Sequence, residues 1–461
     1  MVLLPGETEV RIRVHDAFEY PVCLWETTGY EDRVRIRLTT ESKNRLLDPE
    51  TSKYRCLKVY EVDGSLTTIS QLQDSGLAYD GPWRMLCFVF RSQSSLLPLM
   101  LYRISVYLKT DDKDVYEIGE TWISPSQMSG SQGILKLLLL SEKSRPVGFI
   151  VVDYLIVKSF ESDKSPPATN WWQSLNSSAP SLHIGHRGVG MSLNRSCGAS
   201  CAENTLPSLE LAGKSGADFV EFDVSLSKDK ELVLFHDCHV QIKQGRLTVT
   251  QDLKNMTASE LKLVQMTKST NTELEDSKYF PTLTETLEKI EKDVGFLIEA
   301  KFPEPEEDVP LPATYYFDRN EYAEILLKAL FQSARSRRII LTSFDADFCT
   351  MLKLKQSVYP VLFTTCLDDS SCQRCSFDLR SKTLNFSVAF AEAENFLGIS
   401  ALQKTFLNNP SLIKVPQSRG KLLFVWSDRE TTRDEVQLFE EKGVNGIIYD
   451  RIDVIRGASA H

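Results

Sequence analysis

The sequence lacks several patterns that would assign it to a common functional class. No run of about 18 apolar residues occurs, so we expect no membrane-spanning helix, and the opening MVLLPG has no long apolar stretch typical of a signal peptide. No Lys/Arg-rich run occurs and the net charge is -10, so we expect no nucleic-acid partner. The glycines form neither G-x-G-x-x-G nor G-x-x-x-x-G-K-[ST], so neither nucleotide-binding loop is predicted.

Cysteine is present without the spacing of a disulfide framework or a metal site. The 10 cysteines are scattered, and several, such as Cys23, Cys87 and Cys349, lie inside apolar runs. The lone C-x-x-C formed by Cys372 and Cys375 has no second pair or histidine nearby, so we predict no zinc site there. The pattern favours reduced thiols in a cytoplasmic protein.

The chain length of 461 residues predicts more than one domain. Residues 1–158 contain eight short segments rich in Val, Ile, Tyr and Leu, separated by turn residues, which predicts a smaller all-β, sandwich-like domain. No catalytic constellation occurs there, so binding or scaffolding is its expected role, with an unidentified protein partner. Residues 159–180 are rich in Ser, Pro and Asn and predict a linker.

Residues 181–461 alternate between apolar strand patterns and amphipathic helix patterns. This repetition predicts an α/β domain, specifically a TIM (β/α)8 barrel, with a doubly wound open sheet as the alternative. The expected strands are 181–188, 218–227, 231–237, 295–301, 339–345, 361–365, 421–427 and 444–450. The expected helices are 204–216, 282–293, 321–337 and 432–443.

Histidine is scarce and unevenly placed. Four of the six histidines lie between residues 183 and 239. His186 and His236 each end a predicted strand and each precede a charged residue, Arg187 and Asp237. Active sites of such barrels lie at the carboxyl ends of the strands, and imidazole titrates near neutrality, so we interpret these two as a general acid and base. The other two histidines are expected to be structural.

Three carboxylates, Glu221, Asp223 and Glu299, lie near the ends of two predicted strands. Crowded carboxylates repel one another unless a cation is present, and hard oxygen ligands suit Mg²⁺ first, with Ca²⁺ as the alternative. A salt-bridged pair on a solvated face is the competing interpretation. The apolar neighbours Phe222 and Val224 favour a buried strand and therefore argue against a solvated face.

Two cationic residues accompany the proposed metal ligands. Arg187 and Lys301 would bind an anionic phosphate beside the metal, and Gly188 would allow the backbone to approach it. Glu203 could orient Arg187 or join the metal ligands. Asn204 fits either a helix N-cap or a role in the site.

The connection between Asp223 and His236 is too short for a crossover helix. A tight turn at Asp229-Lys230 would fold the two arms into an antiparallel pair. Counting outward from that turn predicts that Asp223 lies directly across from His236.

The joint pattern resembles the glycerophosphodiester phosphodiesterase family. The resemblance rests on His186-Arg187-Gly188, Glu203-Asn204-Thr205, EFDVSLSKDKELVLFHD, Glu299-Ala300-Lys301 and the final GIIYD, and spans about residues 181–455. It implies a TIM barrel that cleaves a small-molecule glycerophosphodiester to sn-glycerol 3-phosphate and an alcohol, using a divalent metal. The residues that the resemblance assigns are the metal ligands Glu221, Asp223 and Glu299, the acid–base pair His186 and His236, the phosphate-binding Arg187 and Lys301, and an aromatic pocket residue, Trp426, for which a buried core position is the alternative.

A narrower resemblance is to the cytosolic glycerophosphocholine phosphodiesterase branch. It rests on the long insertion VGMSLNRSCGASCA before Glu203 and on VGFIVVDYLIVK before the linker. That branch carries a starch-binding module, a β-rich middle region and then the barrel. Because residues 7–15 resemble the start of the middle region, we expect the starch-binding module to be absent from this chain.

The family mechanism implies that one histidine deprotonates the glycerol 2-hydroxyl, which attacks phosphorus while the other histidine protonates the leaving choline. Two alternatives stay open at this point. One is a lysophospholipase D acting on a single-chain phospholipid, and the other is a non-catalytic scaffold that acts through the β-rich domain. The preferred alcohol, the metal and the assignment of acid and base to the two histidines are also open.

Overall fold

The computed structural model describes all of the chain except residues 1, 16–20, 26, 28, 31–32, 43–55, 63–66, 71–75, 80–83, 111–113, 165, 167–169, 176–178, 193–197, 245–246, 265–279, 304–315, 368–377 and 458–461. Its contacts divide the chain into two compact units. One comprises Met1–Glu161, Pro312–Thr314 and Ser376–Ala393, and the other comprises the rest. The C-x-x-C at 372–375 and parts of the expected linker lie outside the described residues.

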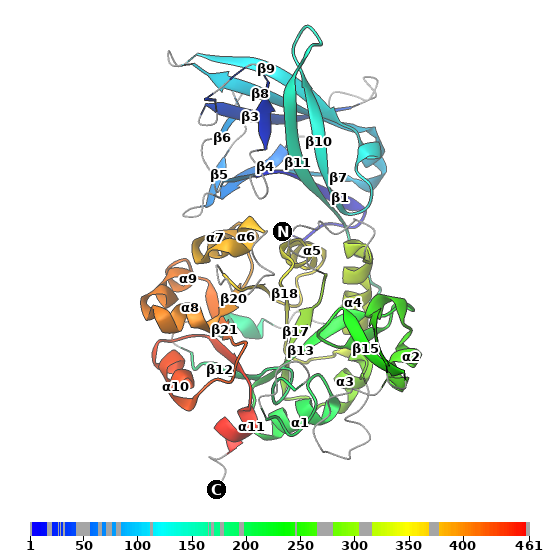
Figure 1. The fold of residues 1–461 in the computed structure, drawn as a ribbon, viewed down its shortest axis with the longest axis vertical. Coiled ribbons are helices and arrows are strands. Elements are labelled where there is room, and N and C mark those ends of the chain that lie inside the picture. The colour runs from blue at the N-terminus through cyan, green and yellow to red at the C-terminus, as the bar shows by residue number, and fades with distance from the viewer. Residues whose placement is uncertain are drawn as a thin grey trace. The chain divides into compact units, whose positions relative to one another are not determined.

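The first unit is built on one antiparallel sheet of 11 strands, in the order β5-β4-β7-β1-β11-β10-β9-β8-β3-β6 with β2 paired to β11 (Figure 1). Alternate residues of β1, including Val10, Ile12 and Val14, enter its apolar core, as period-two patterning requires. The strands are β1 (Glu7–His15), β2 (Val22–Leu24), β3 (Val34–Ser42), β4 (Cys56–Val62), β5 (Thr67–Ser70), β6 (Leu77–Tyr79), β7 (Met85–Gln93), β8 (Met100–Lys109), β9 (Val115–Ile123), β10 (Gln132–Leu140) and β11 (Pro146–Lys158).

All eight strands predicted in this region are present. The three that were not predicted, β2, β5 and β6, have only three or four residues each, too few to show a periodic pattern. Two helices also belong to this unit, α6 (Leu379–Lys382) and α7 (Leu384–Ala393). Phe386 and Ala389 of α7 pack against Met85, Cys87 and Val89 of β7 in a separate apolar cluster.

The second unit contains a closed barrel of eight parallel strands, ordered β12-β22-β21-β20-β19-β18-β17-β13, with β13 pairing back to β12. Closure confirms the TIM barrel and rules out the open sheet. The strands are β12 (Leu182–Gly185), β13 (Phe219–Leu226), β17 (Gly295–Ala300), β18 (Ile339–Ser343), β19 (Val361–Thr365), β20 (Gly398–Leu402), β21 (Leu422–Trp426) and β22 (Gly446–Tyr449). One of them, β20, was not predicted.

Helices surround these strands (Figure 1). They are α1 (Leu206–Lys214), α2 (Ala258–Leu263), α3 (Leu283–Lys289), α4 (Arg319–Ser333), α5 (Ala346–Lys355), α8 (Gln403–Asn408), α9 (Lys414–Ser418), α10 (Arg433–Glu441) and α11 (Ile452–Ile455). Four of them, α1, α3, α4 and α10, correspond to the predicted helices. A separate hairpin joins β15 (His239–Gln244) to β16 (Leu247–Asp252).

The strand predicted at 231–237 is β14 (Leu232–Leu234), which pairs antiparallel with β13 and is not one of the eight barrel strands. The predicted register is wrong by one residue. Val224 pairs with Leu234, and the Phe235 N–H donates to the Asp223 carbonyl, so Phe235 rather than His236 lies across from Asp223. The cause is the turn, in which Lys230 adopts a left-handed backbone (φ 63°) and Ser227 N–H bonds to Glu231 O.

The thiol prediction is wrong at one position. Cys366, which follows β19, is disulfide-bonded, whereas Cys23, Cys87, Cys201, Cys238 and Cys349 are thiols. Within the described parts of the chain, none of the helices combines the length and the apolar character needed to cross a bilayer.

Candidate active site

Strand alternation determines which side chains line the carboxyl end of the barrel. One layer of its apolar interior contains Ile184, Phe219, Leu297, Ile340, Leu362, Phe424 and Ile448. Because side chains alternate between faces, the residue two positions further along each strand also points inward. That next layer consists of His186, Glu221, Glu299, Thr342, Thr364, Trp426 and Asp450. Titratable groups therefore gather on β13 and β17 and directly after β12 and β22, and two threonines and an indole occupy β18, β19 and β21.

The three predicted carboxylates, two from this layer and Asp223 two residues further along β13, meet at this end of the barrel. Asp223 and Glu299 are register partners on neighbouring parallel strands, and one carboxylate oxygen from each of Glu221, Asp223 and Glu299 lies within 4.8 Å of the others. Burial, followed by the charge of Asp223, raises the pKa of Glu221 to about 8. An ionised Glu221 is therefore costly in the site as it stands.

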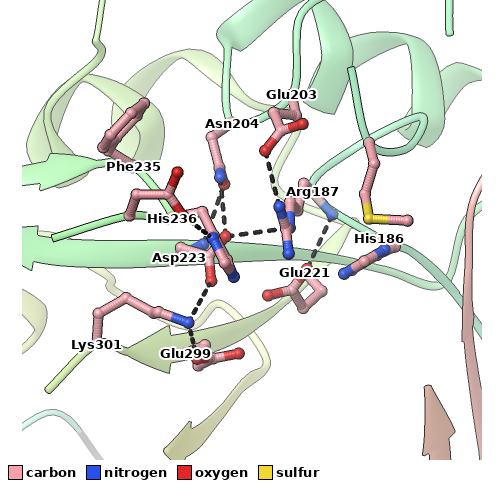
Figure 2. A network of polar contacts seen from close by, with 12 residues as sticks. His186, Arg187, Glu203, Asn204, Glu221, Asp223, Phe235, His236, Glu299 and Lys301 are labelled. Atoms are coloured by element: carbon pink, nitrogen blue, oxygen red, sulfur yellow. Dashed lines mark hydrogen bonds and ion pairs between the residues drawn. The ribbon is translucent and has the colours of Figure 1, made fainter. Parts of the chain in front are cut away.

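The cationic residues are held among these carboxylates (Figure 2). Lys301 Nζ lies 2.6 Å from Glu299 Oε1 and 3.6 Å from Asp223 Oδ1. Arg187 Nε lies 3.4 Å from Asp223 Oδ2, and the Arg187 backbone N–H donates to Glu221 Oε2 at 2.8 Å. Burial alone would raise the pKa of Asp223, but His236, Lys301 and Arg187 outweigh it and lower that pKa below its usual range.

Glu203 holds Arg187 in place. Its Oε1 accepts from Arg187 NH1 at 2.8 Å, and its Oε2 accepts from the Ser192 N–H at 2.6 Å. The Ser192 hydroxyl accepts the Glu203 N–H in return, at 2.8 Å. Of the two sequence interpretations, the contacts favour orientation of Arg187.

Asn204 is not a helix N-cap. Thr205 occupies that position before α1, and the Asn204 amide instead bonds Asp223. Asn204 itself has a left-handed backbone, with φ 57°, a conformation that Asn tolerates better than most residues. Its side chain therefore serves the carboxylate cluster.

The two histidines differ in their surroundings. His186 Nδ1 lies 2.9 Å from the buried Asp450, and although burial lowers the histidine's pKa, this hydrogen bond and the charge of Asp450 produce a net increase. His236 Nδ1 lies 2.6 Å from the half-buried Asp237, and burial together with the charges of Arg187 and Lys301 lowers the pKa of His236.

The remaining histidines of this region lie in other contacts. His183 bonds the Tyr449 hydroxyl and Glu440, and His239 pairs with Asp252 on the hairpin. Trp426 is partly buried. Its indole N–H donates to Thr365 O at 3.2 Å, and its ring meets Phe344 edge to face, so it belongs to both the inner layer and the barrel packing.

Charge supports a divalent cation at this place. In the cluster around Arg187 and Lys301, the two cations face four carboxylates, those of Glu203, Glu221, Asp223 and Glu299. Full ionisation leaves a surplus of two negative charges in a buried site, and one divalent cation would balance it. The all-oxygen ligand set suits a hard cation.

Proteins of similar sequence identify the family of this chain. Residues 186–454 match the model of the glycerophosphoryl diester phosphodiesterase family. The chain is 31% identical to the glycerophosphocholine phosphodiesterase of Homo sapiens over 495 residues, covering 97% of this chain and 72% of that protein. The chain belongs to the glycerophosphodiester phosphodiesterase family. It is therefore an enzyme that hydrolyses glycerophosphodiesters.

The chain also has weaker similarities to other proteins. The glycerophosphocholine phosphodiesterase of Eremothecium gossypii is 26% identical, covering 73% of this chain and 30% of that protein. Among solved structures, a phosphodiesterase from Oleispira antarctica in complex with sn-glycerol-3-phosphate is 20% identical, with a TM-score of 0.46, covering 61% of this chain and 98% of that one.

Asp450 is a site residue that the sequence analysis did not single out. The strand-end rule that selected His186 and His236 also applies to the predicted strand at 444–450, which ends in Asp450. Asp450 has no histidine, lysine or second carboxylate within two residues of it in the sequence, so this single acid carries little local signal.

Proposed function

We propose that this enzyme hydrolyses glycerophosphocholine to sn-glycerol 3-phosphate and choline, with a divalent metal and with His186 and His236 as the acid–base pair. The observation that carries the proposal is the joint placement of two histidines, two cationic side chains and three converging carboxylates at one barrel end. The choice of choline rests on the 31% identity to the human glycerophosphocholine phosphodiesterase.

Glu221, Asp223 and Glu299 would hold the metal, for which Mg²⁺ is our first choice and Ca²⁺ the alternative. When bound, such a cation supplies positive charge that stabilises the phosphate oxygens as their negative charge grows. Arg187 and Lys301 bind the same phosphate from fixed positions. Glu203 holds the Arg187 guanidinium and Glu299 holds the Lys301 ammonium.

The two histidines move the protons. One takes the proton of the glycerol 2-hydroxyl, whose oxygen attacks phosphorus, while the other gives a proton to the departing choline oxygen. A water molecule then opens the cyclic phosphate with the two roles exchanged. Each imidazole Nδ1 is bonded to a carboxylate, so Nε2 is the nitrogen available for these transfers.

A comparison of substrates tests the proposal. The purified enzyme with Mg²⁺ is given glycerophosphocholine, glycerophosphoethanolamine, glycerophosphoinositol and lysophosphatidylcholine, and kcat/KM is measured for each. We expect the highest value for glycerophosphocholine. A higher value for lysophosphatidylcholine would instead identify a lysophospholipase D. An analogue of glycerophosphocholine without the 2-hydroxyl should react poorly, and equal turnover would reject the cyclic route in favour of direct attack by water.

A further inference from the structure

Asp450 lies at the carboxyl end of β22, beside the end of β12. The two strands run parallel with Gly185 opposite Tyr449, and the His186 N–H donates to the Tyr449 carbonyl at 3.2 Å. The Asp450 side chain is completely buried. Its Oδ1 accepts from His186 Nδ1 at 2.9 Å and from the Met191 backbone N–H at 3.2 Å.

The second carboxylate oxygen is unusual. Asp450 Oδ2 is buried and has no hydrogen-bond partner among the residues that the structure describes. A buried carboxylate with an unbonded oxygen destabilises a fold, because its hydration is lost without replacement. A well-packed apolar residue would avoid that cost. Stability therefore does not explain the presence of a carboxylate at position 450.

Other histidine–carboxylate pairs in the described chain do not share this burial. The carboxylate side chains of Asp237, Asp252 and Asp153, which pair with His236, His239 and His15, are 32%, 30% and 18% exposed. Water can hydrate those carboxylates and can replace the imidazole contact. Only His186, in this comparison, meets a carboxylate that water does not reach.

The contact determines where the imidazole proton resides. A carboxylate only accepts hydrogen bonds, so His186 Nδ1 must carry the hydrogen that points to Asp450. In the neutral ring, Nε2 then holds the lone pair. The same Oδ1 also binds the Met191 N–H, and the next residue, Arg451, donates its N–H to Val189 O at 3.0 Å. The end of β22 therefore holds both the imidazole and residues 189–191.

We propose that Asp450 is the positioning residue of His186, fixing the Nδ1–H tautomer and the ring orientation so that Nε2 faces the substrate. The inference rests on the acid–base role of His186 in the proposed function. Asp450 does not touch substrate. It acts through the imidazole, as the buried carboxylate of a catalytic triad acts through its histidine.

Kinetic measurements on four variants of the 461-residue chain, with Mg²⁺ and glycerophosphocholine, test this role of Asp450: Asp450→Asn, His186→Ala, the double variant and Asp252→Asn. The last one alters a histidine–carboxylate pair of the same 2.9 Å separation on the hairpin. We expect Asp450→Asn to lower kcat by about 10²-fold with little change in KM, and Asp252→Asn to match the wild type. The double variant should be no slower than His186→Ala, since Asp450 acts through that ring.

Two kinetic outcomes would overturn the inference. One is a wild-type kcat for Asp450→Asn together with a large loss for His186→Ala. The other is a double variant far slower than His186→Ala, because Asp450 would then act independently of the imidazole. Full activity of His186→Ala is a different result, since it would reject the acid–base role in the proposed function itself.

A second readout depends neither on activity nor on the folding of Asp450→Asn. Nitrogen-15 NMR of the histidine-labelled wild-type enzyme distinguishes the two neutral tautomers, and comparison with His186→Ala assigns the signal. We expect His186 with its hydrogen on Nδ1. A neutral His186 with its hydrogen on Nε2 and a bare Nδ1 would overturn the inference, because that ring cannot donate to Asp450.

Discussion

Asn204 binds Asp223 at both ends of its amide: Nδ2 donates to Asp223 Oδ2 at 2.9 Å, and Oδ1 accepts the Asp223 backbone N–H at 3.0 Å. Both residues are buried. One side chain thus fixes both the backbone and the carboxylate of a proposed metal ligand. These two hydrogen bonds connect the loop before α1 to β13.

Replacing Asn204 with Gly should lower kcat at least tenfold and destabilise the fold by about 1–3 kcal/mol, because buried groups of Asp223 lose their partners. Glycine accepts the left-handed backbone without strain, so the effect would report the lost amide. Asn395→Gly is the matched control, since Asn395 is exposed and has φ 54°. Activity assays and urea unfolding measure both effects, and equal behaviour of the two variants would contradict the account.

Removal of divalent metal should abolish activity, and Mg²⁺ should restore it. Glu221→Gln replaces an ionisable carboxylate with a neutral, weaker amide ligand, so we expect the affinity for Mg²⁺, measured by calorimetry, to fall at least tenfold. Glu210→Gln, on the exposed face of α1, is the control and should bind as the wild type does. Full activity after exhaustive chelation would contradict a metal role for the three carboxylates.

Gly188 leaves no room for a side chain. A Cβ there would lie 2.3 Å from Ser208 Oγ and 2.6 Å from the Ser208 backbone carbon, and the residue has φ 93°. Gly188→Ala should therefore destabilise the protein by about 1–3 kcal/mol through overpacking, in addition to backbone strain, and should reduce activity. Gly420→Ala has only the strain, with φ 65° and nothing within 4 Å. Equal urea midpoints for the two variants would refute the steric argument.

Phe386 of α7 is buried against β7 of the N-terminal sheet. Phe386→Ala should cost about 3–5 kcal/mol of stability, because a large aromatic side chain is lost from a packed cluster. Its neighbour Asn385 is exposed, so Asn385→Ala serves as the control. Thermal unfolding checks the prediction. Identical transitions for both variants would show that α7 adds little to that unit.

Local sequence patterns predicted most strands of the first unit and the barrel, because these elements follow from hydrophobic periodicity. Strand ends led to His186, Glu221, Asp223 and Glu299, because parallel barrel strands bring their carboxyl ends together whatever the loops do. Strand β20 was missed, since Gly398–Leu402 is short and includes Gly and Ser. The β13–β14 register was wrong by one residue because the backbone of Lys230 is not encoded by a recognisable turn motif.

Contacts between distant segments were harder to predict. Helices α6 and α7 lie between two barrel strands in the sequence, yet Phe386 packs on β7, about 300 residues earlier in the chain. Local periodicity alone does not predict a contact over that distance. The Asp450–His186 bond joins the last barrel strand to the first, and only closure of the barrel reveals it. The catalytic roles of the site residues stay proposals.

The measurement that tests the central claim most directly is choline release from glycerophosphocholine with Mg²⁺ present, comparing the wild type with His186→Ala and Glu221→Gln. The account predicts rapid release by the wild type and a loss of about 10²–10⁴-fold in kcat for His186→Ala, the range for removing a general acid or base. Glu221→Gln should also be severely impaired at limiting Mg²⁺. Release by both variants at the wild-type rate would contradict the proposed site.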